Sequence, residues 1–136
     1  FPRVTFENTL DFSFSGVKTA VINAVHKAEQ KGETVVTKDI AASFQKAVCD
    51  SLVEHTVKAA KISGMKTIAL AGGVAANKKL REEMQIASEE NGMAFYCPPL
   101  RLCTDNAVMI GCAGYYQYCN KNFIPLSQNG FATLPL

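Results

Sequence analysis

A glycine turn that leads into a polar helix is the segment of this sequence best suited to ligand chemistry. Leu70 and Ala71 end a short apolar run, Gly72 and Gly73 follow, and Asn77 is the first polar residue of the predicted helix. Unpaired backbone N–H groups at a helix N-terminus attract phosphate, and glycine admits a ligand where a Cβ would block it. Gly72, Gly73 and Asn77, whose amide is suited to a ribose or amide partner, are therefore candidate nucleotide-binding residues. On spacing alone, an ordinary strand-to-helix turn is an equal alternative.

A carboxylate before the last apolar segment is the second candidate. Asp105 lies in the stretch CTDNA, at the expected start of a helix. The helix dipole favours an ionised carboxylate there, which makes Asp105 a candidate metal ligand. The alternative is a helix N-cap provided by Thr104 or Asp105. One carboxylate is not a metal site, because such sites normally take about three or four protein ligands.

The remaining ionisable residues give weaker signals. His26 and His55 fall inside predicted helices, with no second histidine or acidic motif at ligand spacing. Both are predicted to face solvent or to have satisfied structural roles. Lys78, Lys79 and Arg81 form a basic cluster beside the glycine turn. Such a cluster either steers phosphate or RNA or is a solvated helix face.

Cysteine count and net charge narrow the class of protein. Five cysteines without a C-x-x-C pair fit neither a disulfide scaffold nor a zinc site. They are predicted to be reduced thiols in the cytoplasm, mostly small buried core residues.

A net charge of +2 on 136 residues neither demands nor excludes nucleic acid as a partner. No apolar run reaches the roughly 20 residues needed to span a bilayer, so no membrane partner is expected.

Periodicity predicts the elements that position these residues. Apolar residues at helical spacing alternate with two short β-branched runs, and Thr37 is the expected N-cap of the second helix. The expected order is two helices, a strand, a helix, a strand and a helix, over about 17–31, 38–63, 67–71, 74–90, 93–97 and 105–119. The third helix is expected to face inward through Leu80, Met84 and Ala87.

The strand–helix–strand order predicts a fold class. It suggests parallel pairing in a helix-rich α/β protein with a short parallel or mixed sheet. The last helix is apolar on most sides and is expected to be buried. Gly111 and Gly114 share one of its faces and would let another backbone approach closely. Phe1 opens an irregular polar segment and is not Met, so the chain is expected to be part of something longer.

Four segments resemble the TsaD family of tRNA-modifying transferases in order and spacing. They are LDFSFSGVKT (10–19), DIAASFQ (39–45), AGGVAAN (71–77) followed by Leu80 and Arg81, and CTDNA (103–107) followed by Met109 and Ile110. The resemblance covers nearly the whole chain. It implies part of a ribonuclease H-like lobe of the actin-like ATPase (ASKHA) superfamily. Residues 1–136 would be the C-terminal part of the transferase, an incomplete second lobe plus a helix and tail, with the N-terminal lobe absent.

The activity that the resemblance implies is acyl transfer to tRNA in the cytoplasm. Family members pass the threonylcarbamoyl group from threonylcarbamoyl-AMP to the exocyclic amine of the adenosine next to the anticodon, in tRNAs that read codons beginning with A. One divalent metal ion, iron or zinc, helps to hold and polarise the acyl donor. The implied partners are tRNA, a TsaB-like paralogue and a TsaE-like ATPase.

Site residues carry over from the family position by position. Asp105 matches a metal ligand, Asn77 a residue that contacts the adenylate, and Gly72 and Gly73 the turn against the nucleotide; no catalytic residue is assigned. The family's upstream H-x-E-x-H-like motif, which holds two metal-binding histidines, has no counterpart in this sequence. The fragment alone is therefore expected to be inactive and to bind metal weakly. Unpaired strand edges suggest a fragment homodimer.

Two other functions remain open from the sequence. One is a carbamoyltransferase of the hydrogenase-maturation or antibiotic type, which contains a related module. The other is a non-catalytic scaffold that resembles the small paralogue of the transferase. A scaffold would not require the glycine turn, Asn77 and Asp105 together.

Overall fold

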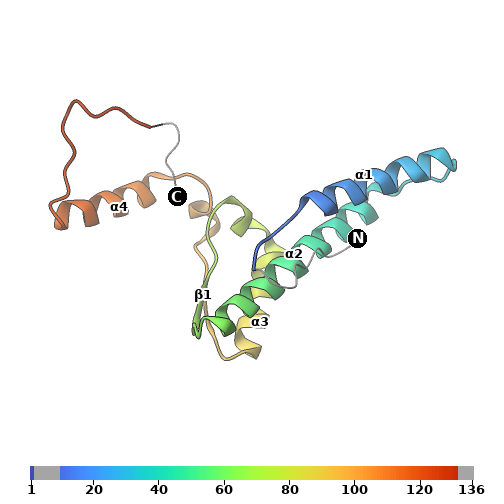
Figure 1. The fold of residues 1–136 in the computed structure, drawn as a ribbon, viewed down its shortest axis with the longest axis horizontal. Coiled ribbons are helices and arrows are strands. Elements are labelled where there is room, and N and C mark those ends of the chain that lie inside the picture. The colour runs from blue at the N-terminus through green and yellow to red at the C-terminus, as the bar shows by residue number, and fades with distance from the viewer. Residues whose placement is uncertain (2–9, 132–136) are drawn as a thin grey trace.

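The computed structural model describes Phe1 and residues 10–131, which form a helix-rich α/β structure (Figure 1). The elements in chain order are α1 (Ser15–Gln30), α2 (Thr37–Ile62), β1 (Thr67–Ala69), the 3₁₀ helix η1 (Gly73–Ala76), α3 (Lys78–Glu90), β2 (Ala94–Tyr96), the 3₁₀ helix η2 (Leu100–Leu102) and α4 (Ala107–Cys119). The expected irregular segment after Phe1 and the end of the tail fall on residues 2–9 and 132–136, outside the described residues.

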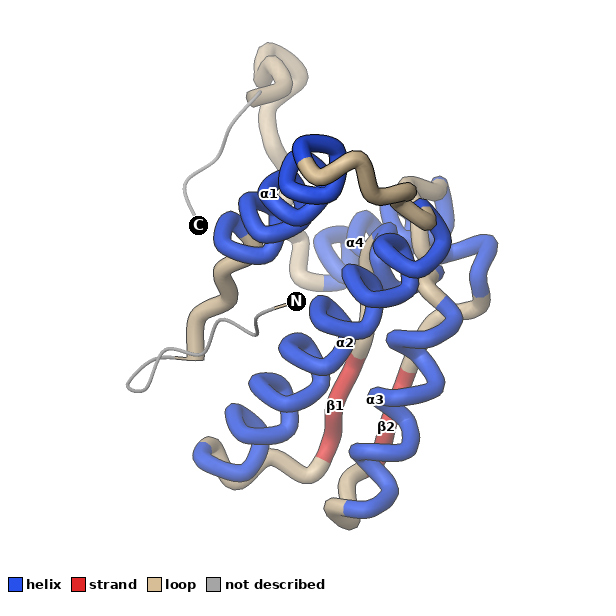
Figure 2. The backbone as a smooth tube through the Cα atoms, turned by 90° about the vertical axis from the view of Figure 1, so that its right-hand side faces the viewer, coloured by secondary structure: helices blue, strands red, loops and turns tan. Residues whose placement is uncertain are grey.

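The two strands pair in parallel, which confirms the pairing predicted from the strand–helix–strand order. Ile68 lies opposite Phe95 in the register. Helices α2 and α3 lie side by side over the two strands, α2 against β1 and α3 against β2 (Figure 2). Ile68 is buried and Phe95 half-buried, whereas their strand neighbours are exposed. One face of the sheet therefore carries the core.

The core lies between α2, α3 and the sheet. Leu80 and Met84 of α3 are 1% and 2% exposed, and they pack with Cys49, Val57 and Ile68. Their inward orientation confirms the prediction from helical spacing. Full burial of such side chains stabilises the fold by about 1.5–3 kcal/mol each.

Helix α2 begins one residue earlier than predicted, and its predicted cap is wrong. Thr37 is its first helical residue, and Val36 occupies the N-cap position without a side-chain hydrogen bond. The buried residues of α2 all lie at Ala47 or later, whereas the apolar side chain of Phe44 is 41% exposed. Only the later part of α2 packs on the sheet, so the earlier part of its apolar stripe stays largely uncovered.

Helix α4 was predicted to be buried, and this prediction is wrong for the described chain. Every residue from Ala107 to Cys119 is exposed, and the helix projects away from the sheet (Figure 1). An ideal Cβ at Gly111 or Gly114 would meet nothing within 4 Å, so no backbone of the described residues approaches this face. Apolar composition made α4 a good core helix, but no other described element is placed to cover it.

The α/β class and the parallel sheet are confirmed, and a complete ribonuclease H-like sheet is not seen. The described residues hold a two-stranded sheet, which is too small to define such a lobe. None of the helices in the described part of the chain has the length and apolar character needed to cross a membrane.

Candidate functional site

A cavity of about 620 Å³ lies beyond the carboxyl ends of the two strands. Gly72 and Gly73 line it from the segment after β1, Pro98 and Asp105 from the segment after β2, and Met109 from α4. Its volume is within the range of about 300–1,000 Å³ typical of small-molecule sites. Open α/β sheets bind ligands outside the carboxyl ends of their strands. The structure therefore brings the predicted glycines and the predicted metal ligand to one hollow.

Gly72 adopts a backbone conformation that requires glycine. Its φ and ψ are 85° and 178°, a region that residues with a Cβ rarely adopt. A Cβ built at Gly72 or Gly73 would meet nothing within 4 Å, so the turn leaves open space next to the main chain. The turn therefore leaves its main chain accessible, and a role in ligand binding stays a prediction.

The glycine turn does not open directly into an α-helix, contrary to prediction. Residues Gly73–Ala76 form η1, and α3 begins only at Lys78. The Asn77 side chain caps α3, because its Oδ1 accepts a hydrogen bond from the Leu80 N–H at 3.1 Å. Side-chain capping favours a helix start at residue 78 rather than 74. No α-helix therefore begins at the glycine turn to attract phosphate through its N-terminus, whereas the main chain of the two glycines is still open.

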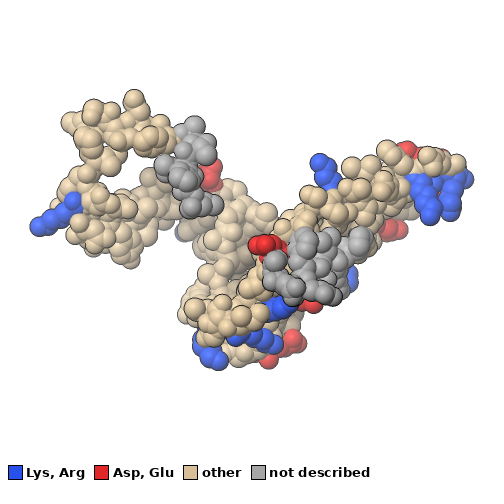
Figure 3. Space-filling view, in the orientation of Figure 1, with Lys and Arg blue, Asp and Glu red and all other residues tan. Residues whose placement is uncertain are grey.

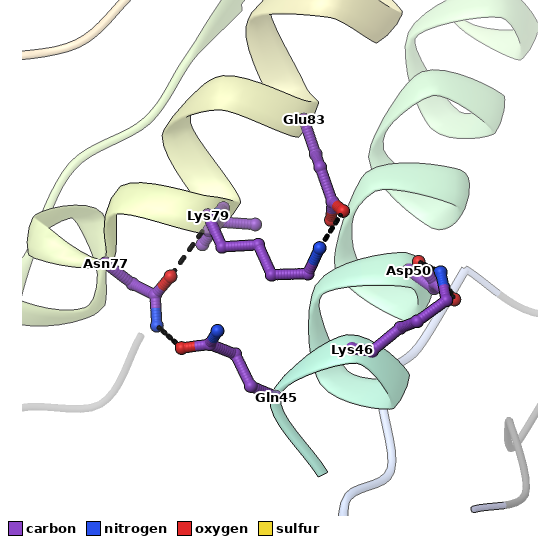
Figure 4. Close-up of polar contacts among 7 residues, drawn as sticks. Gln45, Lys46, Asp50, Asn77, Lys79 and Glu83 are labelled. Carbon is purple, nitrogen blue, oxygen red and sulfur yellow. Dashed lines mark hydrogen bonds and ion pairs between the residues drawn. The ribbon is translucent and has the colours of Figure 1, made fainter. Parts of the chain in front are cut away.

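Asn77 is not among the residues that line the main cavity, so the structure does not bring it together with Asp105 there. Its Nδ2 donates to Gln45 Oε1 on α2 at 3.1 Å (Figure 4). It lines a separate hollow of about 340 Å³ with Gln45 and Val74. The bonds to Leu80 and Gln45 hold the amide between α3 and α2. A role for Asn77 in adenylate binding stays a prediction.

Asp105 is exposed and lies in the loop between η2 and α4, on the wall of the main cavity. The N-cap of α4 is neither Thr104 nor Asp105 but Asn106, whose Oδ1 accepts from the Met109 N–H at 3.0 Å. Asn106 also donates to the carbonyls of Leu102 and Thr104. Because Asn106 caps the helix, the Asp105 carboxylate is left available to a ligand.

The described residues do not form a metal site by themselves. They contain no group of three or more His, Cys, Asp or Glu side chains placed to hold one ion. His26 is exposed, which confirms its predicted solvent-facing position. His55 is buried with its ring 5.4 Å from that of Phe12, but its Nδ1 has no hydrogen-bond partner among the described residues, so the prediction of a satisfied structural histidine is wrong for His55. Asp105 is thus suited to contribute one ligand to a site that needs others.

The basic cluster beside the turn is engaged within the protein. Lys78 pairs with Glu82 at 3.7 Å, and Lys79 pairs with Glu83 (Figure 4). Arg81 is directed inward and donates to main-chain carbonyls. The solvated and structural interpretation therefore accounts for this cluster better than phosphate steering.

All five cysteines are free, as predicted, but only some are buried. Cys49 and Cys103 are buried, Cys97 is half-buried, and Cys112 and Cys119 are exposed on α4. Burial, followed by the nearby Glu83 carboxylate, raises the pKa of the Cys49 thiol. A raised pKa keeps this thiol protonated and unreactive.

Comparison with known proteins identifies the family. The family model described as TsaD, tRNA N6-adenosine threonylcarbamoyltransferase, matches residues 1–112. The chain belongs to the TsaD family.

Curated relatives agree with this family. A tRNA N6-adenosine threonylcarbamoyltransferase of Moorella thermoacetica is 55% identical over 137 residues. Proteins with the same name from Desulfitobacterium hafniense and Clostridium botulinum are 50% and 48% identical. Each match covers 100% of this chain and 40% of the relative. The chain therefore spans about two fifths of the length of these TsaD-family proteins.

The family model and the relatives named above carry the name of the tRNA enzyme, which favours this family over a carbamoyltransferase of the hydrogenase-maturation or antibiotic type. Sequence reasoning found Gly72, Gly73 and Asp105 at the cavity but missed Asn106 and the inward role of Arg81. Asn106 had a usable signal, since Asn is among the best N-caps and directly precedes the apolar run.

Proposed function

We propose that this chain is the part of a tRNA N6-adenosine threonylcarbamoyltransferase that lines one side of its active site. The observation that supports this most directly is the cavity at the carboxyl ends of β1 and β2. There, the Gly72–Gly73 turn and Asp105 face one hollow in a chain of the TsaD family. The names of the relatives support the same activity.

In the proposed reaction, the exocyclic amine of an adenosine next to the tRNA anticodon attacks the carbamoyl carbon of threonylcarbamoyl-AMP. A C–N bond forms, the C–O bond to the phosphate breaks, the amine loses a proton and AMP leaves. The substrate tRNAs read codons that begin with A. The glycine turn would lie against the nucleotide, where the absence of a Cβ permits close contact. Asn77 would approach the adenylate from the neighbouring hollow, beside Gln45.

Asp105 would be one ligand of a divalent metal ion, iron or zinc, that polarises the acyl donor. The described residues hold too few ligands for this ion, so we propose that the others come from the part of the relatives that this chain does not span. That part would also complete the ribonuclease H-like lobe and add the N-terminal lobe. tRNA, a TsaB-like paralogue and a TsaE-like ATPase are the proposed partners. A tRNA substrate and five free thiols support a cytoplasmic location.

Asp105→Asn in the full-length protein that contains this sequence tests the proposal. Loss of a metal-ligating carboxylate is expected to lower transfer of the threonylcarbamoyl group to tRNA by about 100-fold or more. Asp39→Asn is the matched control, because Asp39 is an exposed carboxylate in the first turn of α2. Unchanged transfer by Asp105→Asn would instead favour a scaffold role for the chain.

The isolated chain provides a second test. Because Asp105 has no companion ligands among the described residues, the chain is expected to bind zinc or iron weakly and to have no transferase activity. Isothermal titration that showed tight binding of one metal ion per chain would contradict this.

We also propose that the isolated chain forms a homodimer. The two-stranded sheet has an open edge on each strand within the described residues, and such edges pair with other chains. Analytical ultracentrifugation is expected to show dimers whose fraction rises with concentration. A single monomeric species at high concentration would disprove it.

A further inference from the structure

Arg81 of α3 connects the two loops that line the main cavity. Its Nη1 donates to the Ala75 carbonyl at 3.0 Å, and its Nη2 donates to the Pro98 carbonyl at 2.8 Å. Nη1 also lies 3.5 Å from the Sγ of buried Cys103. Ala75 follows the glycine turn, and Cys103 stands two residues before Asp105 in the sequence. One side chain therefore holds both loops.

The strand pairing ends where this connection begins. The Leu70 N–H donates to the Tyr96 carbonyl at 2.9 Å, at the carboxyl ends of the strands. Among the described residues, we find no direct hydrogen bond between segments 71–76 and 97–106. Arg81 thus provides a side-chain connection between these two segments, through Ala75 and Pro98.

The guanidinium group is suited to this task. It is planar and always charged, and it presents several N–H donors in a rigid fork, so it can bond two carbonyls in fixed relative positions. A lysine ammonium is a point charge on a flexible stem and cannot reproduce this geometry. Cys103 adds to the same cluster, because its Sγ lies 3.6 Å from the Pro99 carbonyl.

We propose that Arg81 is a positioning residue of the transferase, which sets the distance between the glycine turn and Asp105. This inference rests on the proposed function. Arg81 would act by holding main-chain carbonyls of the two loops, and not by binding a tRNA phosphate. A displacement of about 1 Å in such a site can lower a rate by about 100-fold.

Arg81→Lys in the full-length protein is the first test, with Asp105→Asn and the double variant. Arg101→Lys is the matched control, since Arg101 is an exposed arginine that does not line the cavity. In assays at a temperature below the unfolding transition of the variant, Arg81→Lys is expected to lower kcat/KM for transfer by about tenfold or more. In the Asp105→Asn background, measured in single turnovers with excess enzyme, the same change is expected to add little, because residues that act through each other are not additive.

Chemical rescue separates positioning from a general loss of stability. Arg81→Ala is expected to regain part of its activity with millimolar methylguanidinium but not with methylammonium. Only methylguanidinium restores the planar set of N–H donors that bonds the two carbonyls. Three results would overturn the inference. Arg81→Lys could keep the wild-type kcat/KM, or its loss could multiply independently with the loss caused by Asp105→Asn. The third is that methylguanidinium does not rescue Arg81→Ala selectively. If Asp105→Asn itself keeps full activity, the proposed function fails instead, and this result is distinct from the others.

Discussion

The packed region, which consists of α2, β1, α3 and β2, encloses much of its apolar side-chain surface, whereas the C-terminal helix α4 leaves its apolar side chains exposed. In the packed region, Leu80 and Met84 are almost fully enclosed between α2, α3 and the sheet. In α4, Val108 and Ile110 are 62% and 71% exposed. The sequence from Asn106 to Leu136 contains one charged side chain, Lys121, and the surface of its described part is nearly free of charge (Figure 3).

The difference shows that hydrophobic composition and burial are separate properties. Helix α3 alternates charged and apolar residues, so one face meets a partner and the other meets water. Helix α4 is apolar around its circumference and has no such partner in the described residues. Contiguous exposed apolar surface of this kind marks an interaction face. We expect the two regions to differ in dynamics, stability and chemical reactivity.

Hydrogen exchange of the chain should show the largest contrast. Amides of α3 are expected to exchange only through global unfolding, whereas those of α4 exchange through local opening with a free energy near zero. Mass spectrometry of peptides from the two helices measures this. Equal protection of α3 and α4 would contradict the comparison.

Leu80→Ala should destabilise the fold strongly. Removing a buried leucine leaves a cavity, and the free energy of unfolding is expected to fall by about 2–5 kcal/mol. Leu126→Ala makes the same change in the exposed C-terminal region and is expected to alter it by less than about 0.5 kcal/mol. Urea denaturation followed by circular dichroism distinguishes the two, and similar losses would disprove the contrast.

Removal of the Asn77 cap of α3 should lower the global stability more than removal of the Asn106 cap of α4. Asn77→Ala is expected to lower the free energy of unfolding by about 1 kcal/mol, because it removes the cap of a helix in the core. Asn106→Ala should reduce the helical content of α4 while the midpoint of global unfolding stays nearly unchanged. Asn77→Ser and Asn106→Ser, which keep a capping oxygen, are the controls. An equal shift in midpoint for both alanine variants would show that α4 unfolds with the core.

The smallest effect concerns pH. Burial raises the pKa of the Cys49 thiol, so this thiol ionises at a lower pH in the unfolded chain than in the folded chain. The stability that this provides is fully present below the usual thiol pKa and is lost as pH rises through the raised value. Cys49→Ser should therefore flatten the alkaline fall in the free energy of unfolding, and Cys119→Ser, at an exposed position, should not. Denaturation series at neutral and alkaline pH test this, and parallel curves for all three proteins would refute it.

Much of the architecture follows from local signals in the sequence. Helical spacing and glycine stops place α1, α2 and α3 within a few residues, and short β-branched runs place both strands. The parallel pairing follows because a helix connects them. Gly72, Gly73 and Asp105 were found at the cavity because turn glycines and a carboxylate before an apolar helix are visible locally.

The details of the site depended on competition among neighbouring residues. Asn77 and Asn106 both became caps because an amide oxygen next to a free N–H satisfies a bond that would otherwise be lost. As a result, Asn77 turned toward Gln45 on α2, while Asp105 stayed free in its loop. The spacing of residues in the sequence does not reveal which of several neighbouring polar side chains forms the capping hydrogen bond.

The sequence by itself determined the helices, the parallel strands, the glycine turn and the family, because these depend on short-range pattern and residue identity. Only the tertiary structure decided that Arg81 joins Ala75 to Pro98, that Asn77 bonds Gln45 outside the cavity of Asp105, and that α4 lies uncovered within the described residues. These features depend on which distant segments meet in space, and burial of an apolar side chain requires a partner surface that no local pattern specifies.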